Sequence, residues 1–285
     1  MTRPAARAAD VRIISYAQNA EDMVLRRVFG ERTDGFYIDI GANHPVIDSV
    51  TKHFYDKGWH GINVEPVASL HELLQQHRPR DVNVRVGVGA EPGRLALGVV
   101  TSNEALSSFH HELSSNNSAA GLDVDEQLVD VITLAALCER HAPTTGIDFL
   151  KVDVEGFEEQ VFAGNDWDRF RPKVILAEDN FSDNWHALLL SKGYTQTLHD
   201  GLNRFYVRND LLAELGPLLA RPAVIATDGF DPWRYQSQIV TMRRQIEAAG
   251  LDPDGGRVSF HRIRRVLRPL ARTRWGVALR RRLGR

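Results

Sequence analysis

The 285-residue sequence contains a single cysteine, Cys138, and no run of eighteen apolar residues. One cysteine excludes an internal disulfide, a CxxC redox pair and a zinc site built from several thiolates. Because no apolar run reaches the length needed to cross a bilayer, the sequence predicts no transmembrane helix. The first thirty residues also lack an apolar stretch of signal-peptide length. We therefore expect a protein of a reducing, cytoplasmic compartment.

The formal net charge of -2 hides a strong asymmetry along the chain. Residues 255–285 contain eleven Arg and no Lys, Asp or Glu, which leaves 24 basic against 37 acidic residues in 1–254. An acidic body argues against nucleic acid as the ligand of the globular part. The basic tail, in contrast, has the composition of a segment that contacts an anionic membrane surface. A solvated tail and an RNA-binding tail are the alternatives.

Short apolar runs alternate with helical patterns from residue 36 onward, which predicts an α/β fold built on a mostly parallel sheet. The expected strands are 36–40, 61–65, 82–88, 94–100, 129–134, 147–154 and 173–178. The expected helices are 46–57, 67–77, 134–140, 155–163 and 183–192. The last two apolar pieces, 194–198 and 203–207, are expected to form an antiparallel hairpin.

The same patterns suggest three parts of the chain. We expect a catalytic body at 10–209, a helical extension at 210–254 and the basic tail at 255–285. The polar stretch 101–127 is too long for a tight connection between strands, so we interpret it as a mobile lid or substrate loop.

Gly41 follows a predicted buried strand directly, in the segment FYIDIGAN (36–43). In open parallel sheets such loops line the binding crevice. A dinucleotide would require GxGxxG to hold its pyrophosphate, but Asn43 and Val46 occupy the second and third glycine positions. With Asp39 two residues before Gly41, the loop suits a ligand with a positive end. The alternative is a plain turn glycine after a core strand.

Glu65 ends the second predicted strand, 24 residues after Gly41. A carboxylate at this point can accept hydrogen bonds from both hydroxyls of a ribose. The alternative is a solvated charge at a strand end. Together with Gly41, Glu65 predicts an adenosine-bearing ligand without a pyrophosphate.

The residues DIGAN (39–43) and Glu65 resemble the nucleoside-binding elements of class I S-adenosylmethionine-dependent methyltransferases. Three longer stretches, YAQNAED (16–22), 35–66 and 147–164, resemble the FkbM family. The resemblance spans about residues 13–207. Ala17 and Ala20 depart mildly from the family pattern YSQNGED, and 211–285 lies outside it.

This resemblance implies a Rossmann-like class I methyltransferase fold, with a mostly parallel seven-stranded sheet that ends in an antiparallel hairpin. It also implies methylation of hydroxyl groups on sugars of polyketides, glycolipids or surface polysaccharides, with S-adenosylmethionine as the cofactor. A glycolipid acceptor would suit a peripheral position on the inner membrane face. The cofactor-binding residues that it implies are Gln18, Asp39, Gly41, Ala42, Asn43, Glu65 and Pro66.

Methylation of an alcohol requires a base near the hydroxyl, and carboxylates or histidines usually serve. Asp153, in KVDVEG (151–156), is our first candidate for the base or for a polar anchor, with Glu155 and Glu178 as further catalytic candidates. Glu155 has an alternative role as a charge at a helix N-terminus. Asp179 adjoins Glu178 at the end of the next predicted strand.

Three or four such carboxylates could hold a divalent cation, or could bind sugar hydroxyls. No loop spacing demands a metal, so none is predicted. His44, His110 and His111 are alternative bases, although each also fits a surface histidine. Two other functions stay open at this point, an NAD-dependent oxidoreductase and a non-catalytic binding protein recruited by its basic tail.

Overall fold

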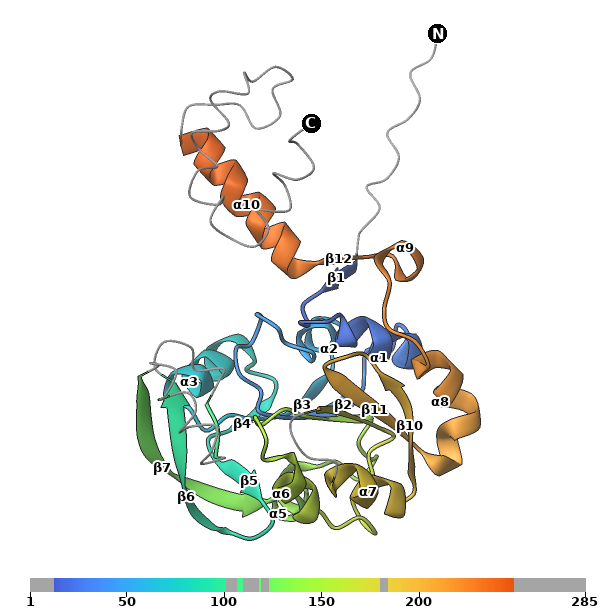
Figure 1. The fold of residues 1–285 in the computed structure, drawn as a ribbon. Helices are drawn as coiled ribbons and strands as arrows, with labels where there is room; N and C mark the ends of the chain where they lie inside the picture. Colours follow the sequence, from blue (N-terminus) through green and yellow to red (C-terminus); the bar gives the residue numbers. More distant parts are fainter. Residues whose placement is uncertain (1–12, 101–106, 110–117, 119–122, 180–183, 249–285) are drawn as a thin grey trace. The chain divides into compact units, whose positions relative to one another are not determined.

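The computed structural model describes residues 13–100, 107–109, 118, 123–179 and 184–248. The chain divides into two units, Met1–Pro232 and Trp233–Arg285. The first unit holds the sheets and most of the helices, and the second holds α10 (Trp233–Ala248) (Figure 1). Within the described residues, every helix is too short or too polar to cross a membrane. The tail 255–285 lies outside these residues.

A seven-stranded sheet with the order β10-β11-β9-β8-β2-β3-β4 forms the centre of the first unit. In this sheet β11 is antiparallel to β9 and β10, and the other described pairs are parallel. The predicted terminal hairpin is therefore confirmed. The strand bounds are β2 Phe36–Ile40, β3 His60–Val64, β4 Val82–Val84, β8 Phe149–Val152, β9 Val174–Glu178, β10 Tyr194–His199 and β11 Asn203–Arg208.

Helices cover both faces of this sheet because alternate residues of its strands point to opposite sides (Figure 1). On one side, Ile38 and Leu150 join a buried cluster with α5 (Leu134–His141), α6 (Glu158–Ala163) and α7 (Asn184–Ser191). On the other side, Tyr37 and Phe149 join a second cluster with α1 (Glu21–Phe29), α2 (Lys52–Asp56) and α8 (Leu212–Leu219). Three tryptophans are buried in these clusters: Trp59, Trp167 and Trp185.

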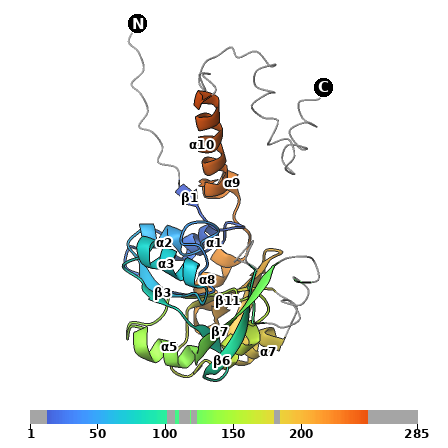
Figure 2. The same ribbon diagram turned by 90° about the vertical axis from the view of Figure 1, so that its left-hand side faces the viewer.

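A separate three-stranded sheet, in the order β5-β7-β6, contains the strand predicted at 94–100 and extends the one predicted at 129–134. It consists of β5 (Gly87–Gly89), β6 (Gly93–Val100) and β7 (Val124–Thr133), and Figure 2 shows β6 and β7 side by side. The single strand predicted at 82–88 is thus two strands in different sheets. At Gly87 a Cβ would lie 2.7 Å from the Phe109 ring, so a larger residue at this position would displace the ring.

The region 43–51 corrects the helix predicted at 46–57. The helix found there, α2, covers only Lys52–Asp56, and Asn43 and Asp48 have left-handed backbones with φ 51° and 57°. Such dihedrals interrupt a right-handed helix. The helix predicted at 155–163 is shortened for the same reason, because Glu155 and Gly156 have positive φ and α6 begins at Glu158. Helix α3 (Ala68–His77) closely matches its prediction.

The predicted loop 101–127 is partly a strand, because residues 124–127 belong to β7. His110 and His111 lie outside the described residues, as does most of the predicted lid. The segment 107–109 is described, and Ser108 forms an antiparallel bridge with Gly98 of β6.

The first unit extends beyond the body predicted at 10–209. Strand β1 (Ile13–Ser15) pairs in parallel with β12 (Phe230–Pro232). The chain reaches β12 through η2 (Asn209–Leu211), α8 and α9 (Ile225–Asp228). Leu215 and Leu219 of α8 are buried in the same cluster as Leu25 and Phe29 of α1. Residues 210–232 therefore belong to the compact unit that carries the sheet.

Candidate functional site

Gly41 is where the loops that follow β2 and β8 touch. Its φ is +76°, and a Cβ at this position would lie 1.8 Å from the Asp153 carbonyl oxygen. The Asp153 N–H donates to the Ile40 carbonyl at 3.0 Å, which keeps the two loops together. A glycine is required here both for the backbone conformation and for the close approach.

The Lys151 side chain of β8 connects the two loops that meet at Gly41. Its buried ammonium donates to the Gly41 carbonyl at 2.6 Å and lies 3.3 Å from carboxylate oxygens of both Asp39 and Asp153. Burial alone would lower the pKa of Lys151, but the two carboxylates raise it above its usual value. Asp39 is buried and also accepts from the Thr51 hydroxyl, so its carboxylate faces the protein interior and supports the loop.

Glu65 joins the loops that follow β2 and β3. One carboxylate oxygen accepts from the Asn43 N–H at 2.9 Å, and the other accepts from the Val67 N–H at 2.8 Å. The side chain is buried, and this burial raises the pKa of Glu65 to about 7. The position of Glu65 beside the Gly41 loop matches the arrangement predicted from the sequence.

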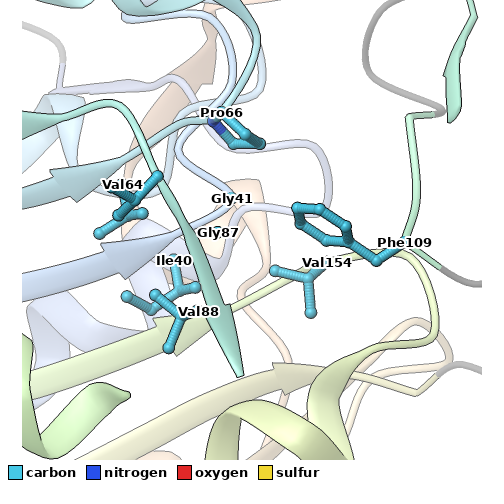
Figure 3. A pocket seen from close by; sticks show the side chains of 9 residues that line it. Ile40, Gly41, Val64, Pro66, Gly87, Val88, Phe109 and Val154 are labelled. Atoms are coloured by element: carbon cyan, nitrogen blue, oxygen red, sulfur yellow. The ribbon is translucent and has the colours of Figure 1, made fainter. Parts of the chain in front are cut away.

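An apolar pocket lies beside Gly41 and is lined by Val64 and Pro66, the chain neighbours of Glu65 (Figure 3). The Phe109 ring forms one wall and also contacts Phe157, with 5.5 Å between the ring centroids. The nine residues around the pocket are Ile40, Gly41, Val64, Pro66, Val86, Gly87, Val88, Phe109 and Val154. The sequence gives no sign of Phe109 or of 86–88, because apolar residues in a pocket look like core residues.

Asp153, Glu155 and Glu178 come together at the carboxyl ends of β8 and β9, as predicted. One carboxylate oxygen of each lies within 4.8 Å of the others, and each residue is partly buried. Such a cluster could hold a divalent cation or accept hydrogen bonds from hydroxyl groups. Asp179 belongs to a different group, because it pairs with His199 at 3.2 Å and Arg204 at 2.8 Å.

A sequence model of the family described as "Methyltransferase FkbM domain" matches residues 39–197, which is more than half of the chain. The chain belongs to the FkbM methyltransferase family. The match begins at Asp39 and includes Gly41, Glu65, Asp153 and Glu178. Curated proteins provide no match to this chain.

The segment YAQNAED (16–22) precedes the matched FkbM domain, and Glu21, one of its two buried acids, connects it to the seven-stranded sheet. Glu21 accepts from the Asn203 side chain at 2.7 Å, and Asn203 pairs with Glu178 in the sheet register. Asp22 accepts from the Ser15 hydroxyl at 2.7 Å. The Gln18 side chain is exposed. The segment is thus fixed at the same sheet edge as the carboxylates.

One alternative interpretation of a polar residue is corrected near this edge. His44 is no free base, because its Nδ1 atom accepts from the backbone N–H groups of Val46 and Ile47 at 3.0 and 2.9 Å. These bonds shape the turn after the Gly41 loop.

We expect the first unit to lose stability as pH rises from 6.5 to 8. Burial raises the pKa of Glu21 to about 8, so the folded protein holds a proton that the unfolded chain has already released. Raising the pH through this interval therefore favours unfolding, by about 1–2 kcal/mol for this group. Urea denaturation at both pH values measures the loss, and Glu21→Gln, which is neutral throughout, should reduce it. An unchanged pH dependence in that variant would contradict this role of Glu21.

Proposed function

We propose that the chain is an S-adenosylmethionine-dependent O-methyltransferase that acts on a sugar hydroxyl of a glycolipid, a polysaccharide or a glycosylated metabolite. Membership of the FkbM family supports methyl transfer. One observation supports the proposed cofactor and acceptor. The Gly41 loop borders both an apolar pocket, which lies near Glu65, and the cluster of carboxylates that includes Asp153. The pocket suits an adenosine, and the cluster suits a polyhydroxyl acceptor.

The residues around the pocket fit the cofactor. Phe109 and Pro66 offer apolar surfaces for an adenine ring. Each Glu65 oxygen accepts one backbone N–H and retains a second lone pair for a ribose hydroxyl. Gly41, Ala42 and Asn43 form the loop that would meet the amino acid part of the cofactor, and Asp39 supports this loop through Lys151. S-adenosylmethionine would supply a methyl group activated on a sulfonium.

The carboxylate cluster supports a sugar as the acceptor. Asp153, Glu155 and Glu178 present oxygens within 4.8 Å of one another, and neighbouring sugar hydroxyls can donate to several of them at once. Holding the acceptor in one orientation against the methyl group contributes to the rate, and a carboxylate can take the hydroxyl proton.

Calorimetric binding of S-adenosylhomocysteine to the full chain tests this proposal, with NAD as the comparison. We expect a micromolar Kd, which is about -8 kcal/mol, for S-adenosylhomocysteine alone. Phe109→Ala should weaken binding by about 1–3 kcal/mol because it removes a stacking surface. Phe170→Ala is the matched control, since Phe170 lies outside the pocket. Equal binding of NAD, or a Phe109 variant that binds normally, would contradict the proposed cofactor site.

The acceptor is tested by transfer of a labelled methyl group from S-adenosylmethionine to a panel of methyl glycosides and glycolipids. We expect a labelled methyl ether on a sugar. Label found on a carboxyl or an amine would contradict O-methylation of a sugar.

We further propose, from the sequence alone, that residues 255–285 contact an anionic membrane surface. Each basic residue near such a surface contributes about 1 kcal/mol. The full chain should therefore sediment with phosphatidylglycerol vesicles and not with phosphatidylcholine vesicles. Replacing Arg280, Arg281 and Arg282 with Gln should weaken this binding by about 3 kcal/mol. Binding to RNA without binding to anionic vesicles would overturn the proposal.

A further inference from the structure

The three clustered carboxylates have different surroundings. Asp153 lies 3.3 Å from the Lys151 ammonium, whereas the Glu155 carboxylate forms no ion pair with any described residue. We infer that Glu155 takes the proton of the acceptor hydroxyl, and that Asp153 and Lys151 are positioning residues. This inference rests on the proposed methyl transfer and assigns a role in that reaction to each of these residues.

Asp153 is poorly placed to accept a proton because it is already paired. Lys151 lies between Asp39 and Asp153 and also donates to the Gly41 carbonyl. A proton on Asp153 would cancel its charge and weaken its bond to the ammonium that holds the Gly41 loop. Asp153 thus serves the site best when it stays ionised and the loop stays in place.

Negative groups surround Glu155. Asp153 and Glu178 lie in its cluster, Glu158 follows on α6, and Lys151 is the cation that opposes them. Burial, together with the charges of Asp153 and Glu158, raises the pKa of Glu155 to about 7. A group that gains and loses a proton near neutral pH is well suited to general base catalysis.

The backbone at Glu155 is held in an unusual conformation. Its φ is +52°, a left-handed value that few residues other than glycine adopt. The Ser108 hydroxyl donates to the Glu155 carbonyl at 2.6 Å, and Glu158 accepts from the Val154 and Gly156 N–H groups on either side. Strained residues that are fixed by several contacts occur often at reactive positions. These hydrogen bonds fix the backbone at Glu155 and thereby the direction in which its side chain begins.

In the inferred step the acceptor O–H bond breaks, and its proton moves to a carboxylate oxygen of Glu155. The hydroxyl oxygen forms a bond to the methyl carbon. The carbon–sulfur bond breaks, and its electron pair stays on sulfur, which becomes a neutral thioether. Glu155 then releases the proton to water.

Carbon-13 NMR of the full chain, labelled at the Asp and Glu carboxyl carbons and kept in EDTA, tests this assignment without cofactor or acceptor. We expect the resonance that Glu155→Gln removes to titrate near pH 7. Asp153→Asn should move this midpoint to lower pH, because it removes a neighbouring negative charge. Glu126→Gln is the control. Glu126 is an exposed residue of β7, and its replacement should leave the Glu155 midpoint unchanged.

The second readout is methyl transfer to the sugar acceptor from the panel. Glu155→Gln should lower the rate by about 100-fold or more and leave S-adenosylhomocysteine affinity within about twofold. Asp153→Asn should keep more activity and shift the pH profile in the same direction as the Glu155 midpoint. A Glu155 resonance with no midpoint near pH 7, or a Glu155→Gln variant with the wild-type rate, would overturn the inference. Failure to bind S-adenosylhomocysteine would instead count against the proposed function, and the NMR result would still decide the protonation of Glu155.

Discussion

Gly41→Ala should lower the affinity for S-adenosylhomocysteine by more than about 100-fold, or about 3 kcal/mol, and should also destabilise the fold. The added Cβ would lie 1.8 Å from the Asp153 carbonyl oxygen, a backbone atom that cannot rotate away. The loops after β2 and β8 would have to separate, and the Lys151 bond to the Gly41 carbonyl would be disturbed. Overpacking of this kind costs typically 1–3 kcal/mol, and the positive φ adds to that cost.

Gly229→Ala provides a matched control for the backbone. Gly229 has φ +66°, close to that of Gly41, but nothing lies within 4 Å of the Cβ that alanine would add there. This variant therefore shows only the cost of a left-handed alanine, about 1 kcal/mol. Calorimetry and urea denaturation of both variants separate the two effects. Equal losses in both would show that the contact between the loops has no importance of its own.

The edge of the sheet where the site lies could be predicted from the sequence. Five buried residues in a row, Phe36–Ile40, indicate a central strand, and parallel strands bring their carboxyl ends to one edge. Gly41, Glu65 and the Asp153 cluster follow such strand ends, so their proximity follows from the topology alone.

The pocket and the second sheet could not be predicted in this way. Phe109 reaches the pocket from a polar stretch, and its position depends on the bridge between Ser108 and Gly98. The strand predicted at 82–88 divides because its two halves pair with different partners, β3 and β7. Both features depend on contacts between distant segments, and hydrophobic periodicity does not predict such contacts.

The pairing of Lys151 with Asp39 shows a contact that the sequence does not predict for this residue. Asp39 was expected to face a ligand, since it is charged and precedes Gly41. The strand register places Asp39 opposite Lys151 on β8, and the ammonium neutralises it inside the protein. Register of this kind follows from the sheet order, which puts β8 beside β2 although more than 100 residues separate them.

Lys151→Met should lower the free energy of unfolding by about 3–5 kcal/mol, because it leaves buried Asp39 without its ion pair. Two carboxylates would then face each other across the place of the lost ammonium, and the Gly41 carbonyl would lose its donor. Urea denaturation measures the loss, and Lys192→Met, which removes an exposed lysine, should stay within about 0.5 kcal/mol of the wild type.

A second substitution distinguishes an electrostatic cause from lost packing. Adding Asp39→Asn to Lys151→Met should recover part of the loss in urea denaturation at pH 7, because it removes one of the two unpaired charges. A loss that Asp39→Asn does not relieve would mean that Lys151 contributes through its aliphatic chain, and the Gly41 loop would then depend on packing instead of charge.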